Sequence, residues 1–379
     1  MRRCRVAPRA DWRARVEAQG LLFHSVDGHY WAEGSYYELS PSEIDAIERA
    51  TGELHAMCIA AAEHVIATKR YAELGIPEVA VPLIEATWEA EPPSLYGRLD
   101  LALGPDGVPK LLEYNADTPT SLLEGSVIQW AWREDVLPAR DQFNTIHERL
   151  IATWTDLKPH LTAGVAHFGC VEDVEDEMTI GYLRDTAEQA GIATTGILME
   201  DIGWSADRQR FIDRDGVEIA TLFKLYPWEG LLTDEFGPLI ARVPGLCWLE
   251  PAWKMLMSSK GILPVLAELF PDHPSVLPAW FAASSAPHDL ASGWVKKPLH
   301  GREGNNVTIA APGVDAASGG PYDQEAFVYQ QYADLGEHDG MRPVIGSWLI
   351  GGEPAGVGIR ETAGYITNNT ASFVPHVIA

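Results

Sequence analysis

Cysteine and positive charge are both scarce in this sequence. Only four cysteines occur among 379 residues, and no two of them have a C-x-x-C spacing. So few thiols in so long a chain argue against a disulfide framework. Lysine and arginine together number 28 against 54 acidic residues, which gives a formal net charge of −26. Because nucleic acids and anionic membranes bind basic surfaces, we expect neither as a partner.

Long hydrophobic runs are missing as well. No apolar stretch reaches the roughly 18 residues of a membrane-spanning helix, and none with the length of a signal peptide follows the arginine-rich N-terminus. We therefore expect a soluble cytoplasmic protein. Apolar residues make up 46% of the chain, which is enough to bury a large core and excludes a mainly disordered protein.

The acid excess permits a cationic partner, such as an amine, a polyamine or a metal ion. The few lysines are unevenly distributed, since five of the eight lie between residues 224 and 297. In an acidic, lysine-poor chain, this clustering indicates an anion-binding region.

The order of predicted elements indicates an α/β chain of the α+β kind. We expect helices at residues 40–74, 120–150 and 258–270, the first because Ser-Pro-Ser-Glu is typical of a helix start. A strand, a helix and a strand over residues 164–198 form a βαβ unit, which requires a parallel sheet. A second hairpin is expected at residues 210–226, and short strands with glycine-rich turns follow Gly293.

These patterns place soft boundaries near residues 160 and 250. We expect an N-terminal part (1–160) with a hairpin and helices, a parallel α/β domain (161–250) and a C-terminal part (251–379). A chain of this length exceeds what one hydrophobic core usually supports.

The most informative stretch is a predicted hairpin at residues 97–115, in which Gly-Pro-Asp-Gly separates two alternating runs. A symmetric turn pairs Asp100 with Glu113 and Arg98 with Asn115, and directly opposed residues point to the same side. All four polar groups are then expected on one face. The other face is predicted to meet the core through Leu99, Leu101, Leu103, Leu112 and Tyr114.

Two carboxylates that face each other repel, so a positive group must lie between Asp100 and Glu113. Either Arg98 or a bound cation provides that charge. Carboxylate oxygens together with the amide oxygen of Asn115 suit Mg²⁺. A solvated polar face with an ion pair to Arg98 explains the pattern equally well, and these residues alone do not decide between the two.

A second candidate region combines lysines with a glycine-containing loop. A predicted strand at residues 294–299 contains Lys297, and the glycines of the following loop stand at 301 and 304. Such a loop can cover phosphate oxygens with its amides, although β-hairpins with two glycines are common. Together with Lys260 it offers what a triphosphate needs, positive charge and a mobile lid. The strand at residues 327–332 could recognise an adenine edge.

Several longer motifs resemble the synthetase domain of glutathionylspermidine synthase and its shorter relatives, the acid–amine ligases. The similarity extends over nearly the whole chain, from about Phe23 onward. The segments that carry it are Glu113–Glu124, Glu250–Lys254, Ser259–Pro264, Lys297–Pro298, Arg302–Gly304, Ile345–Trp348 and Phe373–His376.

The resemblance implies an ATP-grasp architecture preceded by a Rossmann-like, pre-ATP-grasp domain with a parallel sheet. It also implies an ATP-dependent carboxylate–amine ligase. In that reaction ATP phosphorylates a carboxylate, an amine attacks the acyl phosphate, and an amide forms while ADP and phosphate leave. The implied partners are ATP with Mg²⁺, a small carboxylate or peptide acid, and an amine or polyamine. The oligomeric state is left open.

The resemblance further assigns roles to the hairpin and the loop. It implies that Arg98 stabilises the transferring phosphoryl group and that Arg302 enters the site when the loop closes. The implied Mg²⁺ ligands are Asp100, Glu113 and Asn115. The implied ATP contacts are Lys260, Lys297, Gly301, Arg302, Glu303, Gly304, Gln330, Gln331 and Tyr332.

The acid substrate is expected near Thr118, Thr120 and the acidic pair Glu175 and Asp176. Both threonines stand where the bifunctional family member has serines, so the resemblance does not carry glutathione over as the acid.

Two other classes of function are open at this stage. A non-catalytic ATP-binding protein of the same fold would keep the same residues and is the main alternative to the ligase. A hydrolase that uses Asp100 and Glu113 as its two carboxylates would leave Lys260, Lys297 and the loop without a role.

Overall fold

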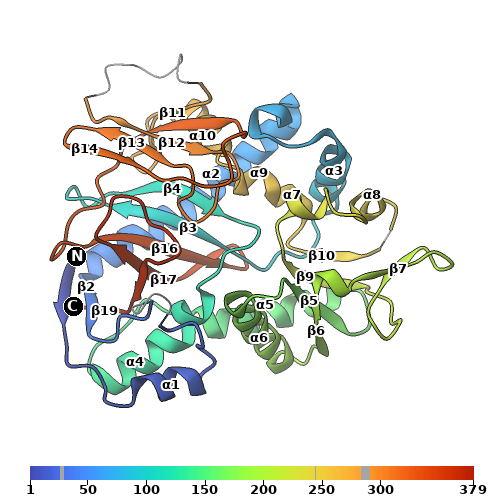
Figure 1. Cartoon of the computed structure of the whole chain (residues 1–379), viewed down its shortest axis with the longest axis horizontal. Helices are drawn as coiled ribbons and strands as arrows, with labels where there is room; N and C mark the ends of the chain where they lie inside the picture. Colours follow the sequence, from blue (N-terminus) through green and yellow to red (C-terminus); the bar gives the residue numbers. More distant parts are fainter. Residues whose placement is uncertain (26–29, 244, 283–290) are drawn as a thin grey trace.

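The computed structural model describes residues 1–25, 30–243, 245–282 and 291–379. It combines a parallel sheet, a small mixed sheet and antiparallel sheets with helices packed around them (Figure 1). The helices are α1 (Trp12–Ala18), α2 (Pro41–Thr68), α3 (Val81–Ala90), α4 (Gln129–Val136), α5 (Ile146–Leu157), α6 (Val174–Gln189), α7 (Trp228–Leu231), α8 (Gly237–Ile240), α9 (Met255–Ser258) and α10 (Ile262–Leu269).

The parallel sheet confirms the predicted βαβ unit. Its strands, in the order β10-β9-β5-β6, are Cys247–Leu249, Thr221–Leu225, Ala166–Cys170 and Thr194–Leu198. Helix α6 connects β5 to β6, and the two strands pair in parallel. Loops at the carboxyl ends of such strands commonly hold ligands.

The hairpin predicted at residues 210–226 is confirmed at its turn and wrong in its second arm. The chain reverses at residues 213–216, where the Asp213 amide donates to the Val217 carbonyl and Ile212 forms an antiparallel bridge with Glu218. Strand β8 (Arg210–Ile212) pairs with β7 (Gly203–Ser205), whereas β9 joins the parallel sheet. All five residues of β9 are buried, and a fully buried strand suits the middle of a parallel sheet better than one arm of an exposed hairpin.

A five-stranded antiparallel sheet joins residues from both halves of the chain. Its order is β18-β17-β16-β3-β4, with β18 (Ser372–Val374), β17 (Glu353–Thr362), β16 (Arg342–Ile350), β3 (Tyr96–Leu103) and β4 (Pro109–Asn115). The N-terminal hairpin therefore packs into a C-terminal sheet. The boundaries near residues 160 and 250 stay predictions.

A second antiparallel sheet lies above the hairpin in Figure 1, drawn in orange. Its order is β11-β15-β12-β13-β14, with β11 (Ala279–Trp280), β15 (Phe327–Gln331), β12 (Trp294–Pro298), β13 (Thr308–Ala311) and β14 (Val314–Ala317). Strands β12 to β15 confirm the predicted short strands after Gly293, whereas β11 precedes it.

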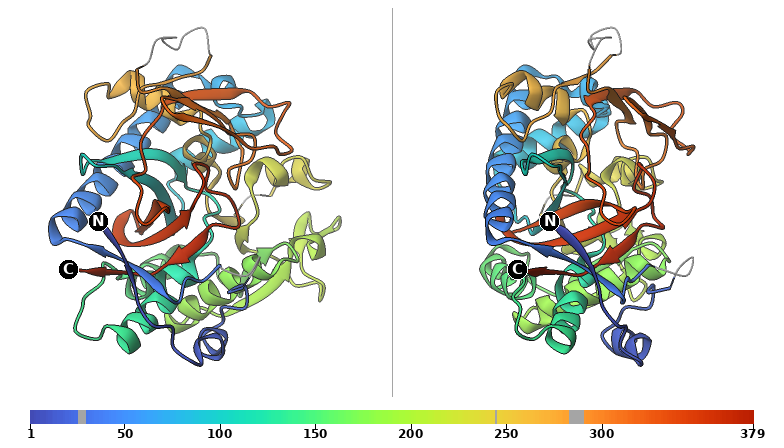
Figure 2. Two further views of the ribbon diagram at one scale, coloured as in Figure 1. Left: turned by 60° about the vertical axis from the view of Figure 1, so that its left-hand side comes forward. Right: turned by 90° about the vertical axis from the view of Figure 1, so that its left-hand side faces the viewer.

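The two ends of the chain lie close together, on the same side of the molecule in both views of Figure 2. They meet in a small sheet of β1 (Arg2–Arg5), β2 (Ser35–Leu39) and β19 (His376–Ile378). The arginine-rich N-terminus is engaged in ion pairs. For example, Arg3 Nη2 lies 2.7 Å from Glu361 Oε1, and Arg9 Nε lies 2.7 Å from Glu33 Oε1.

The predicted helix at residues 40–74 begins as expected but ends early. The Ser40 side chain accepts from the Glu43 amide while the Glu43 carboxylate accepts from the Ser40 amide, which is a capping box. Helix α2 ends at Thr68 because Lys69 adopts a left-handed conformation, and a separate 3₁₀ turn covers Tyr71–Leu74.

The other two predicted helices are interrupted. Residues 120–150 contain a π-helical turn (Glu124–Ile128), then α4, and only the start of α5. The helix predicted at residues 258–270 breaks between α9 and α10, where the Lys260 amide donates to the Leu299 carbonyl. A helix cannot continue where its amide is bonded elsewhere.

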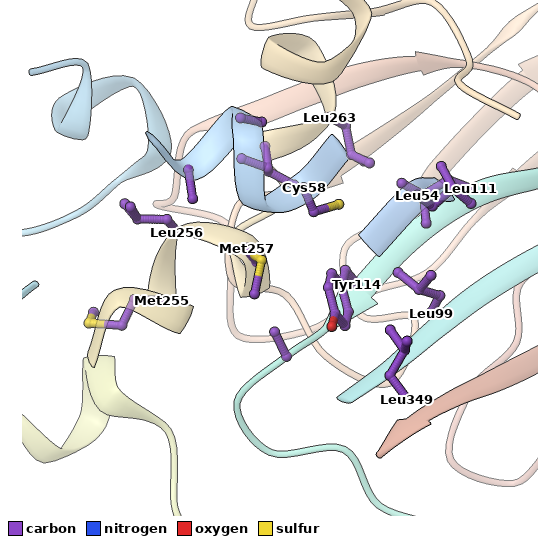
Figure 3. Packing of buried hydrophobic residues seen from close by; sticks show 14 of the residues in the cluster. Leu54, Cys58, Leu99, Leu111, Tyr114, Met255, Leu256, Met257, Leu263 and Leu349 are labelled. Atoms are coloured by element: carbon purple, nitrogen blue, oxygen red, sulfur yellow. The ribbon is translucent and has the colours of Figure 1, made fainter. Parts of the chain in front are cut away.

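The largest hydrophobic cluster lies behind the hairpin. Leu54 and Cys58 of α2 pack with Leu99 of β3, Tyr114 of β4 and Met257 of α9 (Figure 3). This packing buries the apolar face of the hairpin and fixes the direction of its polar face. Within the part of the chain that the structure describes, no helix has the length and apolar character needed to span a membrane.

Candidate active site

The register of the hairpin is the one predicted at its polar end. Arg98 pairs with Asn115 and Asp100 pairs with Glu113. All four side chains line one cavity of about 430 Å³, which lies between the two antiparallel sheets and the carboxyl ends of β5 and β9.

A β-bulge follows immediately, and because of it the prediction that Leu112 faces the core is wrong. Leu101 pairs with Leu111 rather than Leu112, so β4 contains one extra residue at this point. An extra residue shifts the alternation of sides by one position. Leu111 is therefore 1% exposed in the core, while Leu112 lines the cavity.

Each carboxylate of the hairpin already has a cation beside it. Arg98 Nε donates to Asp100 Oδ1 over 2.7 Å, and Lys260 Nζ lies 3.0 Å from Glu113 Oε2. Asn115 Nδ2 lies 3.4 Å from Asp100 Oδ2 and 3.3 Å from Glu113 Oε1, so both carboxylates converge on the Asn115 amide.

The two carboxylates differ in how readily they ionise. Burial opposes the ionisation of Glu113, but the ammonium groups of Lys260 and Lys297 outweigh burial and lower its pKa to about 2. Burial raises the pKa of Asp100, and the attraction of Arg98 only partly offsets it. An added positive charge between them would favour the ionised form of Asp100.

The donor set at this point fits Mg²⁺. Two carboxylates and a side-chain amide supply hard oxygen ligands, and rotation of the Asn115 amide would present its oxygen. Among the described residues, no group of three or more His, Cys, Asp or Glu side chains could hold a metal ion. A cation bound here would therefore depend on Asn115 as well as on Asp100 and Glu113.

Lys297 reaches from β12 to the hairpin. Its Nζ donates to the Leu112 carbonyl over 2.9 Å and to Gln330 Oε1 over 2.8 Å, and Gln330 in turn donates to the Leu111 carbonyl. Burial lowers the pKa of Lys297 to about 8, although Glu113 works in the opposite direction. This ammonium group is thus held in place and only partly solvated.

The glycine loop at residues 301–304 closes one side of the cavity. A Cβ on Gly301 would lie 2.2 Å from the Pro298 ring, and one on Gly304 would lie 2.5 Å from the Thr367 carbonyl. Gly304 also has a φ of +68°, which favours glycine. Its backbone therefore fits closely against the C-terminal segment.

Arg302 is already inside the site in this structure. Its Nη1 donates to Thr118 Oγ1 over 2.7 Å and its Nη2 donates to Glu229 Oε1 over 2.9 Å. Lys260 also ties the loop to the hairpin, because its Nζ donates to the Gly301 carbonyl over 2.6 Å.

A buried ion pair supports both of these Arg302 contacts. Asp117 Oδ1 accepts from Lys224 Nζ over 2.6 Å, and Asp117 Oδ2 accepts from the Trp228 amide over 3.1 Å. Asp117 and Lys224 are 2% and 0% exposed. Since Thr118 follows Asp117 and Glu229 follows Trp228, this pair fixes the two contacts of Arg302 relative to each other.

Every predicted site residue lines the cavity except Glu175, which lies beside it on the first turn of α6. Burial raises the pKa of Asp176 to about 7, and the nearby Asp173 and Glu175 add to the effect. Thr120 and the strand end with Gln331 and Tyr332 also reach the cavity, as expected. The functional roles of these residues stay predictions.

Sequence reasoning missed part of the lining. Trp348 lies with its ring 5.6 Å from the Arg98 guanidinium carbon, and a C-terminal segment contributes several further residues. The lining residues outside the predicted site include Ser121, Tyr226, Trp348, Arg360, Tyr365, Ile366, Thr367 and Asn369. Ser121 and Trp348 stand within two of the segments that carry the resemblance, Glu113–Glu124 and Ile345–Trp348, so the resemblance could have pointed to both.

Comparison with known proteins supports the predicted family. The chain matches the model of the glutathionylspermidine synthase pre-ATP-grasp family over residues 3–379. It is 42% identical over 364 residues to a Haemophilus influenzae protein named "Putative acid--amine ligase", covering 93% of this chain and 92% of that protein. It is 30% identical over 328 residues to trypanothione synthetase from Crithidia fasciculata, covering 79% of this chain and 49% of that enzyme.

Among solved structures, a glutathione synthetase-like effector from Globodera pallida aligns with 97% of this chain and 96% of its own, at 10% identity and a TM-score of 0.59. At that identity the likeness concerns the fold alone, and it supports the predicted ATP-grasp architecture. The match over nearly the entire length and the 42% identity show that this chain belongs to the glutathionylspermidine synthase pre-ATP-grasp family.

Proposed function

We propose that this protein is an ATP-dependent ligase that joins a carboxylic acid to an amine through an acyl phosphate. The main support is the cavity in which Asp100 and Glu113 face Arg98, Lys260 and Lys297. Two carboxylates alone would suit a hydrolase, but such an enzyme has no use for two buried lysines. The relatives named as ligase and synthetase agree with this proposal.

ATP would bind between the hairpin and the sheet that carries Lys297. Lys260 and Lys297 would neutralise phosphate oxygens, and the loop at residues 301–304 would cover them. Asp100, Glu113 and Asn115 would hold Mg²⁺, whose charge would balance that of the phosphates. The strand end at residues 330–332 lines the same cavity and would contact the adenine.

The acid would lie where its carboxylate meets Arg98. This guanidinium is 9% exposed and is aligned by Asp100 and by the Thr120 carbonyl, which accepts from Nη1 over 2.6 Å. A fixed, desolvated donor of this kind stabilises charge that develops during phosphoryl transfer. The acidic end of α6, with Asp176 on the cavity wall, would attract an amine or polyamine.

Phosphate release tests this proposal. The protein with ATP and Mg²⁺ is screened against small acids and peptides combined with diamines, polyamines and amino acids. We expect release that needs both an acid and an amine, and about a hundredfold loss in Lys297→Ala. Lys296→Ala is the matched control, because Lys296 Nζ lies over the Phe327 ring, 3.8 Å from its centroid, and does not line the cavity.

The outcomes separate the two main functions. Wild-type turnover in Lys297→Ala or Asp100→Ala would contradict the ligase. Calorimetric ATP binding without turnover over the whole matrix would instead favour a non-catalytic ATP-binding protein.

A further inference from the structure

Ser121 occupies an unusual position in the wall of the cavity. It has a φ of +64°, in the left-handed region that residues other than glycine rarely adopt, and it is 4% exposed. The preceding residue, Thr120, accepts from Arg98 through its carbonyl. Strained residues of this kind concentrate at functional sites. The strained backbone here places a hydroxyl group next to the residues proposed to bind the acyl phosphate.

A chain of hydrogen bonds leads from Ser121 into the protein interior. Ser121 Oγ lies 3.1 Å from Tyr30 Oη, and Tyr30 Oη donates to Glu124 Oε1 over 2.6 Å. Tyr30 and Glu124 are 2% and 1% exposed. Because the phenol has one proton and gives it to Glu124, the Ser121 hydroxyl is the donor to Tyr30. The chain therefore runs in one direction, from the cavity to a buried carboxylate.

The surroundings of Glu124 suit it to exchanging a proton. Burial raises its pKa to about 7, and the nearby carboxylate of Glu175 on α6 adds to the effect. The hydrogen bond from Tyr30 and the positive charge of Arg360 on β17 act in the opposite direction. No part of the proposed phosphate or metal site uses Glu124.

Amide formation needs such a proton acceptor. An aliphatic amine carries a proton at neutral pH and has no free electron pair until it loses that proton. General bases with a pKa near the working pH serve this purpose best.

We propose that Ser121, Tyr30 and Glu124 form a proton relay that deprotonates the attacking amine. The inference rests on the proposed function. The ammonium nitrogen gives a proton to Ser121 Oγ, the Ser121 proton moves to Tyr30 Oη, and the Tyr30 proton moves to Glu124. The freed electron pair then forms the C–N bond while the C–O bond to phosphate breaks and its electrons leave with the phosphate. The second N–H proton departs on the phosphate, and after product release Glu124 returns its proton along the chain to water in the cavity.

The test compares two nucleophiles that differ in their need for a base. The acid found in the phosphate-release screen is offered either its aliphatic amine or hydroxylamine, which is uncharged at neutral pH. In Glu124→Gln and Tyr30→Phe we expect amide formation with the aliphatic amine to fall about a hundredfold and hydroxamate formation to change little. The wild-type rate with the aliphatic amine should rise with pH through about 7, and Glu124→Gln should lose this rise.

Tyr37→Phe is the matched control. Tyr37 Oη donates to the buried carboxylate of Glu361 over 2.7 Å, so the variant loses the same kind of bond away from the cavity. Ser121→Ala tests the chain from its cavity end if a buried variant fails to fold. Equal loss with both nucleophiles, or no loss with either, would overturn the relay. Absence of both amide and hydroxamate formation in the wild type would overturn the proposed function itself and the relay with it.

Discussion

At the scale of single residues, burial decides the protonation state of two groups, the Lys297 ammonium and the Glu124 carboxyl. Lys297 is 8% exposed and has a pKa of about 8, because burial disfavours its ammonium form more than Glu113 stabilises it. Burial also disfavours the ionised form of Glu124, and because that form is an anion, burial raises its pKa, to about 7. Both groups therefore change charge close to physiological pH.

Lys297 makes ATP binding depend on pH. If only its ammonium form binds phosphate, the affinity for ATP is full below pH 8 and falls towards tenfold per pH unit above it. Lys297→Arg keeps its charge and should bind with no such fall, whatever its absolute affinity. Isothermal titration below and above pH 8 checks this. Lys296→Arg should behave like the wild type, and the same fall in Lys297→Arg would exclude Lys297 as its origin.

Glu124 makes stability depend on pH. Its folded pKa lies above its ordinary value of 4.5, so its contribution is full below that value and is lost as pH rises through about 7. Glu124→Gln avoids this loss. Relative to the variant, the wild type should lose about 3 kcal/mol of unfolding free energy between these pH values. Urea denaturation at both pH values measures it, and a difference that does not change with pH would contradict the prediction.

At the scale of elements, the site depends on contacts between segments far apart in the sequence. The loop at residues 301–304 lies against the segment around Thr367, and Arg302 contacts residues of two other segments. Single substitutions at these contacts can therefore test how much the site depends on each of them.

Gly304→Ala should displace the loop. The new methyl group would meet the Thr367 carbonyl at 2.5 Å, in addition to the backbone strain at a φ of +68°. A cost of about 1.4 kcal/mol to the closed loop raises the KM for ATP about tenfold. Gly313→Ala is the control, because Gly313 has a similar φ of +78° with nothing within 4 Å. Equal effects in both variants would show that strain alone matters.

Asp117→Asn should weaken both the fold and the site. The change leaves the Lys224 ammonium buried without its counter-charge, which typically costs about 3–5 kcal/mol of unfolding free energy. Asp106→Asn removes the partner of an exposed pair with Lys110 and should cost less than about 1 kcal/mol.

The double variant Asp117→Asn with Lys224→Met separates the two effects. Removing both charges should recover much of the stability, as measured by thermal unfolding, because no buried charge is left unpaired. The KM for ATP should stay high, because Thr118 and Glu229 are no longer fixed relative to each other. A double variant with the KM of the wild type would contradict this positioning role.

At the scale of the whole molecule, local chemistry made part of the fold predictable. The capping box at Ser40 and the register that pairs Asp100 with Glu113 depend on neighbouring residues, so both were correctly predicted. The bulge at Leu112 was not, because one extra residue in a strand leaves no trace in composition. Strand β9 was misassigned because its pairing with β5 depends on residues more than fifty positions away.

The candidate site was also predictable only in part. Its charged residues stand in sequence motifs, so the sequence could assign them to one site. The pair of Asp117 and Lys224 is separated by 107 positions, and the contact between Arg302 and Glu229 by 73, so only the folded chain joins them. All four cysteines are free, as a reducing compartment would require, while the cytoplasmic location stays a prediction.

The central claim is that a carboxylate of the substrate is phosphorylated before the amine attacks. The most direct measurement uses the acid found in the phosphate-release screen, labelled with heavy oxygen in its carboxylate, and analyses the released phosphate by mass spectrometry. An acyl phosphate transfers one labelled oxygen from the acid to the phosphate, so we predict one heavy oxygen in each phosphate formed. Phosphate without label, formed while the amide accumulates, would contradict the account.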